Sequence, residues 1–260
     1  MPTTNHWNRQ QLLVAFNLYC RLPFGKFHSR NPEIIRYAGL INRTPSALAM
    51  KLSNIASLDP AITDTGRRGL EGASKADKMM WEEMQNNWAA FAIESNQAQV
   101  IVTEPASSES PEQKLIAEED DHTGSDKIVQ TKARVGQTFF RQAVLSAYNY
   151  RCAITGLSVP KLLVASHIIP WRKDEKNRLN PRNGLSLSML HDKAFDVGII
   201  TINEDMTVRV SKNNYPSGDE FYTKALLQYD GKPIFLPDKF PPNPAFLEYH
   251  REHIFEATPS

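Results

Sequence analysis

Three residues whose side chains suit phosphodiester hydrolysis follow one another within a short part of the chain: His167, Asn183 and His191. A neutral imidazole can take a proton from water, and a second imidazole can hold a divalent cation. An amide can bond backbone or the first ring and so fix its orientation. We therefore expect His167 to be a general base, Asn183 to orient it and His191 to bind a metal. A lone histidine is usually structural, so the argument depends on all three together.

The sequence predicts two strands that would position the first two of these residues. Residues 162–167 are rich in β-forming side chains and are followed by Pro170, so His167 should close a first strand. The turn cluster 180–184 contains Asn183 and leads into the short apolar run 185–187. A strand, a loop and a second strand are expected.

A short helix should carry His191. Ser188 suits the N-cap position, and Gly198 can end the helix after about Val197. The apolar residues that recur at helical spacing are Leu190, Ala194 and Val197.

The motifs from 139 to 211 resemble those of His-Asn-His (HNH) endonucleases, in particular a bacterial restriction-endonuclease group. The shared phrases are Tyr-Arg-Cys-Ala-Ile-Thr-Gly at 150–156, Ala-Ser-His-Ile-Ile-Pro-Trp at 165–171 and Asn-Gly-Leu-Ser-Leu at 183–187. The resemblance implies a ββα-metal fold, metal-dependent cleavage of DNA and the roles given above to His167, Asn183 and His191. It also implies Mg²⁺ or Mn²⁺ as the cofactor.

The chain departs from many relatives at the residue before the general base, which is often an acidic metal ligand but here is Ser166. Asp196 and Asp192 are the nearby acidic candidates for a second ligand. Mg²⁺ keeps several waters and takes phosphate oxygens from a substrate, so few protein ligands are needed.

A second departure concerns zinc. Many relatives hold this small fold with two Cys-x-x-Cys pairs, whereas this chain has only Cys20 and Cys152. Two distant cysteines cannot form a four-thiolate site, so we expect no structural zinc and interpret Cys152 as a packed core thiol.

The net charge of +1 conceals an uneven distribution. Residues 97–126 carry eight acidic residues and one basic residue, and both flanking regions are basic. We predict an acidic flexible linker over 97–132, because this composition buries too little apolar surface to fold. Alternatively, the stretch mimics DNA charge and covers a basic groove.

The N-terminal region, residues 1–96, is expected to be an all-α domain. One helical face would bear Trp7, Leu12, Leu13, Phe16 and Tyr19. A second helix would run over 32–38 and end at Gly39, and a third would start at the Thr44 N-cap and Pro45 and run to about Ala56. Three short helices of this kind resemble a Myb-like or helix-turn-helix unit, with Lys51 facing out. A further single helix is expected over 76–96.

The C-terminal domain, residues 133–260, should open with a helix over 136–148 whose buried face includes Phe139, Phe140, Val144 and Leu145. Later elements are a hairpin over 199–202 and 207–210, a helix over 221–229 and a Pro-rich tail that wraps the domain. The candidate DNA contacts come from both domains and are basic residues: Arg43, Lys51, Arg141, Arg172, Lys173, Lys176, Arg178 and Arg182.

The sequence thus predicts an α+β protein with a helical DNA-targeting domain, a linker and an HNH nuclease. The expected function is a metal-dependent endonuclease of restriction or defence type that acts on double-stranded DNA. The alternatives are an RNA-cutting toxin, a DNA-binding regulator with a retired nuclease, and a structural interaction protein. A homodimer is plausible by symmetry. Without a signal pattern or an apolar run of membrane-spanning length, we expect a cytoplasmic protein that does not contact membranes.

Overall fold

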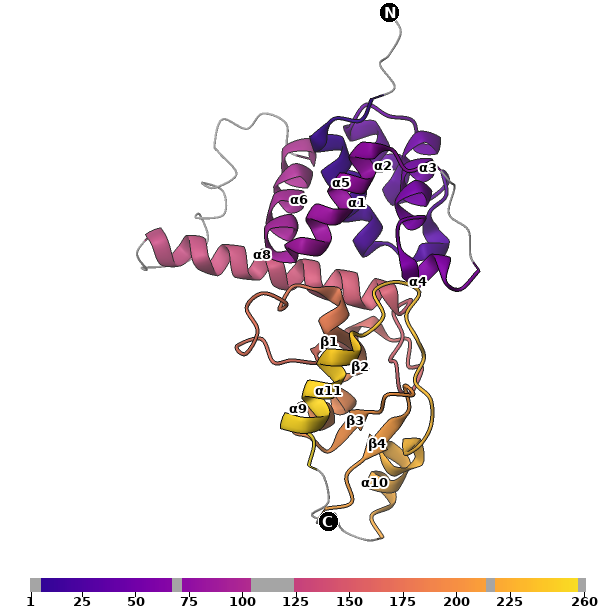
Figure 1. Cartoon of the computed structure of the whole chain (residues 1–260), viewed down its shortest axis with the longest axis vertical. Coiled ribbons are helices and arrows are strands. Elements are labelled where there is room, and N and C mark those ends of the chain that lie inside the picture. Colours follow the sequence, from indigo (N-terminus) through magenta and orange to yellow (C-terminus); the bar gives the residue numbers. More distant parts are fainter. Residues whose placement is uncertain (1–5, 67–71, 104–123, 214–217, 257–260) are drawn as a thin grey trace, which may run out of the picture. The chain divides into compact units, whose positions relative to one another are not determined.

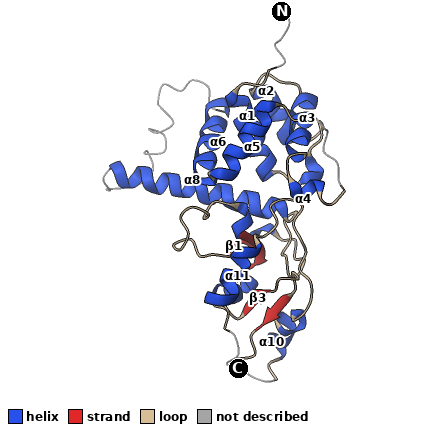
Figure 2. Ribbon diagram, in the orientation of Figure 1, coloured by secondary structure: helices blue, strands red, loops and turns tan. Residues whose placement is uncertain are grey.

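The computed structural model describes residues 6–66, 72–103, 124–213 and 218–256. The chain divides into two compact units, Met1–Gln142 and Ala143–Ser260, called here the first and second unit. Within the described residues the first unit is helical, and the strands belong to the second (Figures 1 and 2). The α+β class is therefore confirmed. No described helix has the length and apolar character needed to cross a lipid bilayer.

The first unit packs its helices around α1, which contacts α3 and α6 (Figure 1). Capping side chains set the helix starts: Asn8 forms a capping box with Gln11, and Thr44 accepts a hydrogen bond from the Ala47 amide. The helices are α1 (Arg9–Arg21), α2 (Pro32–Leu40), α3 (Pro45–Ala56), α4 (Pro60–Thr63), α5 (Lys75–Asn86) and α6 (Trp88–Thr103), with a 3-10 turn at Phe24–Lys26.

The apolar faces predicted for the first and third helices are confirmed. Leu12, Leu13, Phe16 and Tyr19 of α1 are buried, as are Leu48, Leu52 and Ile55 of α3. Gly39 does not end α2, because it lies inside the helix, and the turn is instead made by Asn42 at a φ of 53°.

The single helix expected over 76–96 is wrong. Asn87, with a φ of −149° and a ψ of 80°, separates α5 from α6, and its side chain accepts a hydrogen bond from the Ala90 amide. A side chain that caps a new helix start stabilises this break. The apolar pattern continues across it because Met84, Trp88 and Phe91 are buried in the same core.

The expected boundaries of the acidic linker also change. Helix α6 continues through Thr103, and α8 (Gly124–Ala147) begins before residue 132. The remaining part, 104–123, lies outside the described residues, so the linker itself stays a prediction. Helix α8 is longer than expected, but its predicted buried residues Phe139, Phe140, Val144 and Leu145 are confirmed.

The second unit contains two antiparallel hairpins and the helices packed on them. Strand β1 (Leu163–His167) pairs with β2 (Gly184–Ser188), and β3 (Ile200–Ile202) pairs with β4 (Val208–Val210). Its helices are α9 (Met189–Asp196), α10 (Glu220–Ala225) and α11 (Pro244–His253), with 3-10 turns at Pro160–Leu162, Pro181–Asn183 and Leu227–Tyr229. Helix α9 packs on β1, β2 and β3, which forms the expected ββα arrangement.

The tail follows the domain surface, as expected, before it forms α11. The Phe235 amide donates to the Ala153 carbonyl, and the Asn243 amide donates to the Arg182 carbonyl. The expected helix over 221–229 is interrupted at Leu226, between α10 and the 3-10 turn.

Candidate active site

The β1–β2 hairpin places His167 at the end of β1, directly opposite Gly184. Asn183 is the residue before β2, so the two predicted site residues lie at the same end of the hairpin. The Ile168 amide donates to the Asn183 carbonyl over 3.0 Å and extends the pairing by one step. The first two residues of the predicted constellation are therefore brought together by strand pairing.

His167 is oriented by a backbone carbonyl. Its Nε2 lies 2.9 Å from the Arg178 carbonyl oxygen, which can only accept, so Nε2 carries the proton of the neutral ring and Nδ1 carries the lone pair. The Trp171 ring packs edge-on against the imidazole at 5.5 Å between centroids. Burial lowers the pKa of His167, and the Arg178 carbonyl and Asp192 offset part of that shift. A neutral imidazole with a basic nitrogen is thus maintained.

Asn183 holds the chain that leaves β1 and does not bond the His167 ring. Its Oδ1 accepts from the Ile169 amide over 2.8 Å, and its Nδ2 donates to the Ile169 carbonyl over 3.2 Å and to the Asn177 carbonyl over 3.4 Å. The side chain is fully buried. Asn183 therefore ties the segment after His167 to Asn177, in the loop between β1 and β2, and it bonds backbone groups, which is one of the two alternatives considered for it.

His191 lies on the buried side of α9. Its Nδ1 is 2.8 Å from the hydroxyl of Ser188, the residue that caps the helix. The ring packs edge-on against Tyr229 at 5.5 Å and is only 4% exposed. Burial lowers the pKa of His191, while the backbone of Ala225 raises it. The contacts of this ring are with the cap of α9 and the region after α10.

Asp192 is the α9 residue whose charge acts on the general base. The carboxylate raises the pKa of His167, and His167 in turn lowers the pKa of Asp192. Burial is the larger effect and raises the pKa of Asp192 overall, although the Ser166 hydroxyl and Lys193 also lower it. Ser166, which replaces an acidic residue of many relatives, thus lies beside a carboxylate supplied by the helix.

Asp196 follows Asp192 by one helical turn. Burial and the negative charge of Asp192 both raise the pKa of Asp196, and Lys193 lowers it. Carboxylates at i and i+4 on a helix repel each other unless a cation lies between them. Helix α9 therefore carries two neighbouring acids, of which Asp192 acts electrostatically on His167.

His191, Asp192 and Asp196, all on α9, are the candidate protein ligands for a divalent cation. Across the described ranges, no three His, Cys, Asp or Glu side chains are grouped so that they could hold a metal ion. An ion held here would have one or two carboxylates and would complete its shell with water and substrate phosphate, as Mg²⁺ commonly does. Such an ion supplies charge to stabilise the phosphoryl group.

The loop between the strands carries the predicted basic residues of the second unit. Arg172, Lys173 and Lys176 are exposed, and within the described part of the chain none of them forms an ion pair. The Asp174 carboxylate instead accepts from the backbone amides of Lys176 and Asn177 and shapes the turn. The loop therefore presents positive charge beside His167.

Three other predicted DNA contacts are placed differently. The Arg178 guanidinium lies 5.0 Å from the Trp171 ring centroid, and Arg182 Nε donates to the Pro241 carbonyl over 3.3 Å. Both side chains are half-buried, whereas Arg141 is exposed on α8. Arg178 and Arg182 thus have structural contacts in addition to any role in binding.

The predicted contacts of the first unit are both engaged inside the protein. Lys51 does not face out, as we expected: it is 6% exposed, and its Nζ lies 2.8 Å from both carboxylate oxygens of Asp77. Arg43 donates to the His6 carbonyl and to Gln11 Oε1. The outward position of Lys51 was wrong because α5 covers that side of α3 with an acidic partner.

Cys152 is a free thiol at the start of the motif, and its burial confirms the interpretation as a core residue. Its sulfur lies 3.3 Å from the Ser188 amide and 3.5 Å from the Thr155 amide. The Ala153 amide donates to the Ser186 carbonyl over 2.7 Å. Hydrogen bonds therefore join the 152–157 turn to β2 and to the N-cap of α9.

The apolar residues that indicated the helix at 188–197 do not all belong to its buried face. Leu190 and Val197 are 42% and 40% exposed, whereas His191, Ala194 and Phe195 are buried. These three buried residues have i, i+3, i+4 spacing and include the larger aromatic side chain.

Residues 152–203 match a family model described as HNH endonuclease. No curated protein matches the chain. The matched segment contains β1, β2 and α9 with His167, Asn183 and both acids. The resemblance of this segment to HNH endonucleases is thereby confirmed, and it implies nuclease activity on a nucleic acid. Residues 152–203 of the second unit are thus identified as an HNH endonuclease domain.

Proposed function

We propose that the protein is a metal-dependent DNA endonuclease of restriction or defence type. His167 is its general base. The observation that carries this proposal is the hydrogen bond from His167 Nε2 to the Arg178 carbonyl, which leaves Nδ1 as the basic nitrogen of a neutral ring. General bases work best when they are neutral and fixed in orientation.

The catalytic arrangement uses Asn183 and the acids of α9. Asn183 positions the backbone after His167 through its bonds to Ile169. Asp192, with Asp196 one turn away, would hold Mg²⁺ or Mn²⁺, and the buried His191 would support α9. This assignment departs from the sequence expectation that His191 binds the metal.

Duplex DNA is the substrate that the basic loop favours. Arg172, Lys173 and Lys176 carry three exposed positive charges beside the general base, a suitable arrangement for phosphate contacts. The first unit supplies selectivity, and a symmetric pair of chains would cut both strands. RNA cleavage is an outcome of the substrate test below.

The test compares His167→Ala with a His253→Ala control, because His253 is exposed and lies outside the motif. Supercoiled plasmid and single-stranded RNA are each incubated with Mg²⁺ or Mn²⁺. We expect plasmid cleavage to fall by about 10²- to 10⁴-fold in His167→Ala only. Equal cleavage by wild type and His167→Ala would remove the base assignment, and a preference for RNA would replace the substrate assignment.

A further inference from the structure

A pocket of about 650 Å³ opens in the first unit between α3, the start of α5 and the segment before α1. This volume lies in the range of small-molecule sites, which are roughly 300–1,000 Å³. The pocket is far along the chain from the HNH motif and has no part in the chemistry described above. Its walls combine aromatic, thioether, amide and charged groups.

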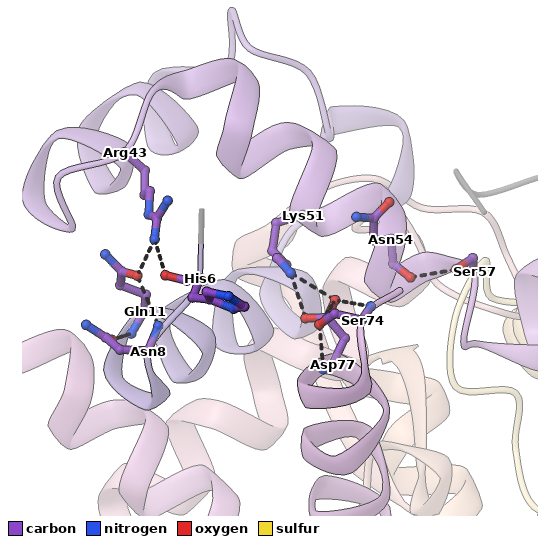
Figure 3. Close-up of polar contacts among 9 residues, drawn as sticks. All are labelled: His6, Asn8, Gln11, Arg43, Lys51, Asn54, Ser57, Ser74 and Asp77. Atoms are coloured by element: carbon purple, nitrogen blue, oxygen red, sulfur yellow. Dashed lines mark hydrogen bonds and ion pairs between the residues drawn. The ribbon is translucent and has the colours of Figure 1, made fainter. Parts of the chain in front are cut away.

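Lys51, one of the residues that line the pocket, is held by a buried ion pair. Lys51 of α3 and Asp77 of α5 point toward each other, and both are almost fully buried (Figure 3). Asp77 also accepts from the amide and hydroxyl of Ser74. The Lys51 charge is neutralised by Asp77, whereas Lys75, which also lines the pocket, is exposed at the start of α5.

An aromatic ring and two exposed thioethers form the apolar part. The Trp7 indole has the Arg43 guanidinium and the Lys51 ammonium each 5.0 Å from its ring centroid, which fixes the ring in place. Met50 and Met79 are 56% and 60% exposed at the pocket. Flexible thioethers beside a fixed indole suit a flat ligand.

Asn54 supplies a hydrogen-bonding edge. It lies one turn along α3 from Lys51 and lines the pocket with it (Figure 3). Among the described residues its side-chain amide makes no hydrogen bond. A carboxamide offers both a donor and an acceptor, the pattern that reads the edge of a purine or pyrimidine.

The pocket also changes what the third helix can do. Ala47, Met50, Lys51 and Asn54 have i, i+3, i+4, i+7 spacing and form one face of α3. This is the face that a helix-turn-helix unit would place in the major groove, but here Trp7 and the start of α5 stand around it. Stacked base pairs cannot enter a pocket of this kind, whereas a single unstacked base can.

We propose that this pocket binds one nucleobase extruded from DNA, with Trp7 and the methionines against the ring and Asn54 on its edge. The inference rests on the proposed function, because it names the DNA feature that the first unit reads. Extrusion costs a few kcal/mol and costs least for an unpaired or mismatched base, so DNA with such a base should bind more tightly.

The experiment measures affinity of the full chain in EDTA, so that binding is separated from cleavage. The probes are two short duplexes that differ only in whether one central base is paired or unpaired. Met79→Trp fills the pocket from an exposed position, and Asn86→Trp places the same ring at the exposed far end of α5 as a control. Asn54→Ala removes the amide without adding bulk.

We expect wild type and Asn86→Trp to prefer the unpaired duplex by about tenfold. Met79→Trp and Asn54→Ala should lose this preference and keep their affinity for the paired duplex. No preference in wild type, or a preference that persists in both pocket variants, would overturn the inference. Metal-dependent cleavage of the paired duplex is measured separately. Cleavage without a preference for the unpaired base would refute only the base-binding role of the pocket. A preference for the unpaired base without cleavage would refute only the nuclease proposal.

Discussion

Replacing single residues on the two sides of α9 separates a metal ligand from a core histidine. Asp192→Asn keeps the size of the side chain and removes its charge, while His191→Phe keeps the ring against Tyr229 and removes both nitrogens. Glu204→Gln is the charge-matched control, because Glu204 is 88% exposed outside the site. If Asp192 holds the metal, only Asp192→Asn should alter the metal requirement.

The magnitudes differ for physical reasons. Loss of a residue that hydrogen-bonds a metal ligand lowers metal affinity or activity by about 10- to 100-fold, and loss of the ligand itself should lower it at least as much. His191→Phe loses the hydrogen bond to Ser188, worth about 1 kcal/mol of stability, or a Tm change on the order of 5 °C for a unit of this size. It should leave the metal titration unchanged.

The effect of Asp192→Asn on the free energy of unfolding tests the role of Asp192 independently of cleavage. Burial raises the pKa of Asp192, so the ionised form is disfavoured in the folded state, and this unfavourable contribution grows as pH rises above the unfolded pKa of 3.8. Asp192→Asn should therefore be at least as stable as wild type at pH 7 although its activity is reduced. A residue retained at a cost to stability is expected at a functional site.

The assays are plasmid cleavage titrated with Mn²⁺ and thermal unfolding without metal. A half-saturating Mn²⁺ concentration and rate in Asp192→Asn equal to those of Glu204→Gln would refute the ligand role of Asp192. A shifted titration in His191→Phe would restore the role first expected for His191.

Four further outcomes follow from the structure. The acidic limb of kcat/KM should lie below pH 6.5, because burial lowers the pKa of His167; a midpoint above 6.5 in a pH–rate profile would contradict a neutral base. Burial also lowers the pKa of His250 to about 4, so the unfolded state takes up its proton at a higher pH than the folded state does. About 3 kcal/mol of stability should therefore be lost as pH falls from 6.5 to 4. Denaturant unfolding should not show this loss in His250→Phe. Lys51→Met should lower the free energy of unfolding by about 3–5 kcal/mol, because Asp77 is then left buried and unpaired. Adding Asp77→Asn should restore part of this stability. An unchanged Tm in Lys51→Met would show that the pair is not buried in solution. Gly198→Ala should cost roughly 2 kcal/mol or more, because φ is 79° and a Cβ would meet the Ile254 carbonyl; circular dichroism melting at the wild-type Tm would disprove this contact.

Local sequence was sufficient wherever a short-range interaction decides the structure. Thr44 and Pro45 fix the start of α3, and Ser188 with Gly198 brackets α9, because capping bonds and a positive φ depend on residues next to each other in the chain. The HNH phrases likewise identify the ββα motif, since its strand, turn and helix are adjacent in sequence.

Errors arose where the decisive partner is distant in sequence. The helical pattern around Lys51 predicted an outward side chain, but Asp77, 26 residues later, pairs with it. The apolar pattern over 76–96 predicted one helix, although Asn87 separates two helices. The pattern continues across Asn87 because Met84 and Trp88, one on each side, are buried in the same core.

The sequence by itself determined the kind of chemistry: it supplied a base, an amide and acids within one nuclease motif. Only the tertiary structure decided which side of α9 faces the base, because the face that is buried depends on packing against β1, β2 and β3. That packing turns His191 toward Tyr229 and Asp192 toward His167. A helix of eight residues carries too few apolar side chains for periodicity alone to choose between two neighbouring faces, and long-range contacts make the choice.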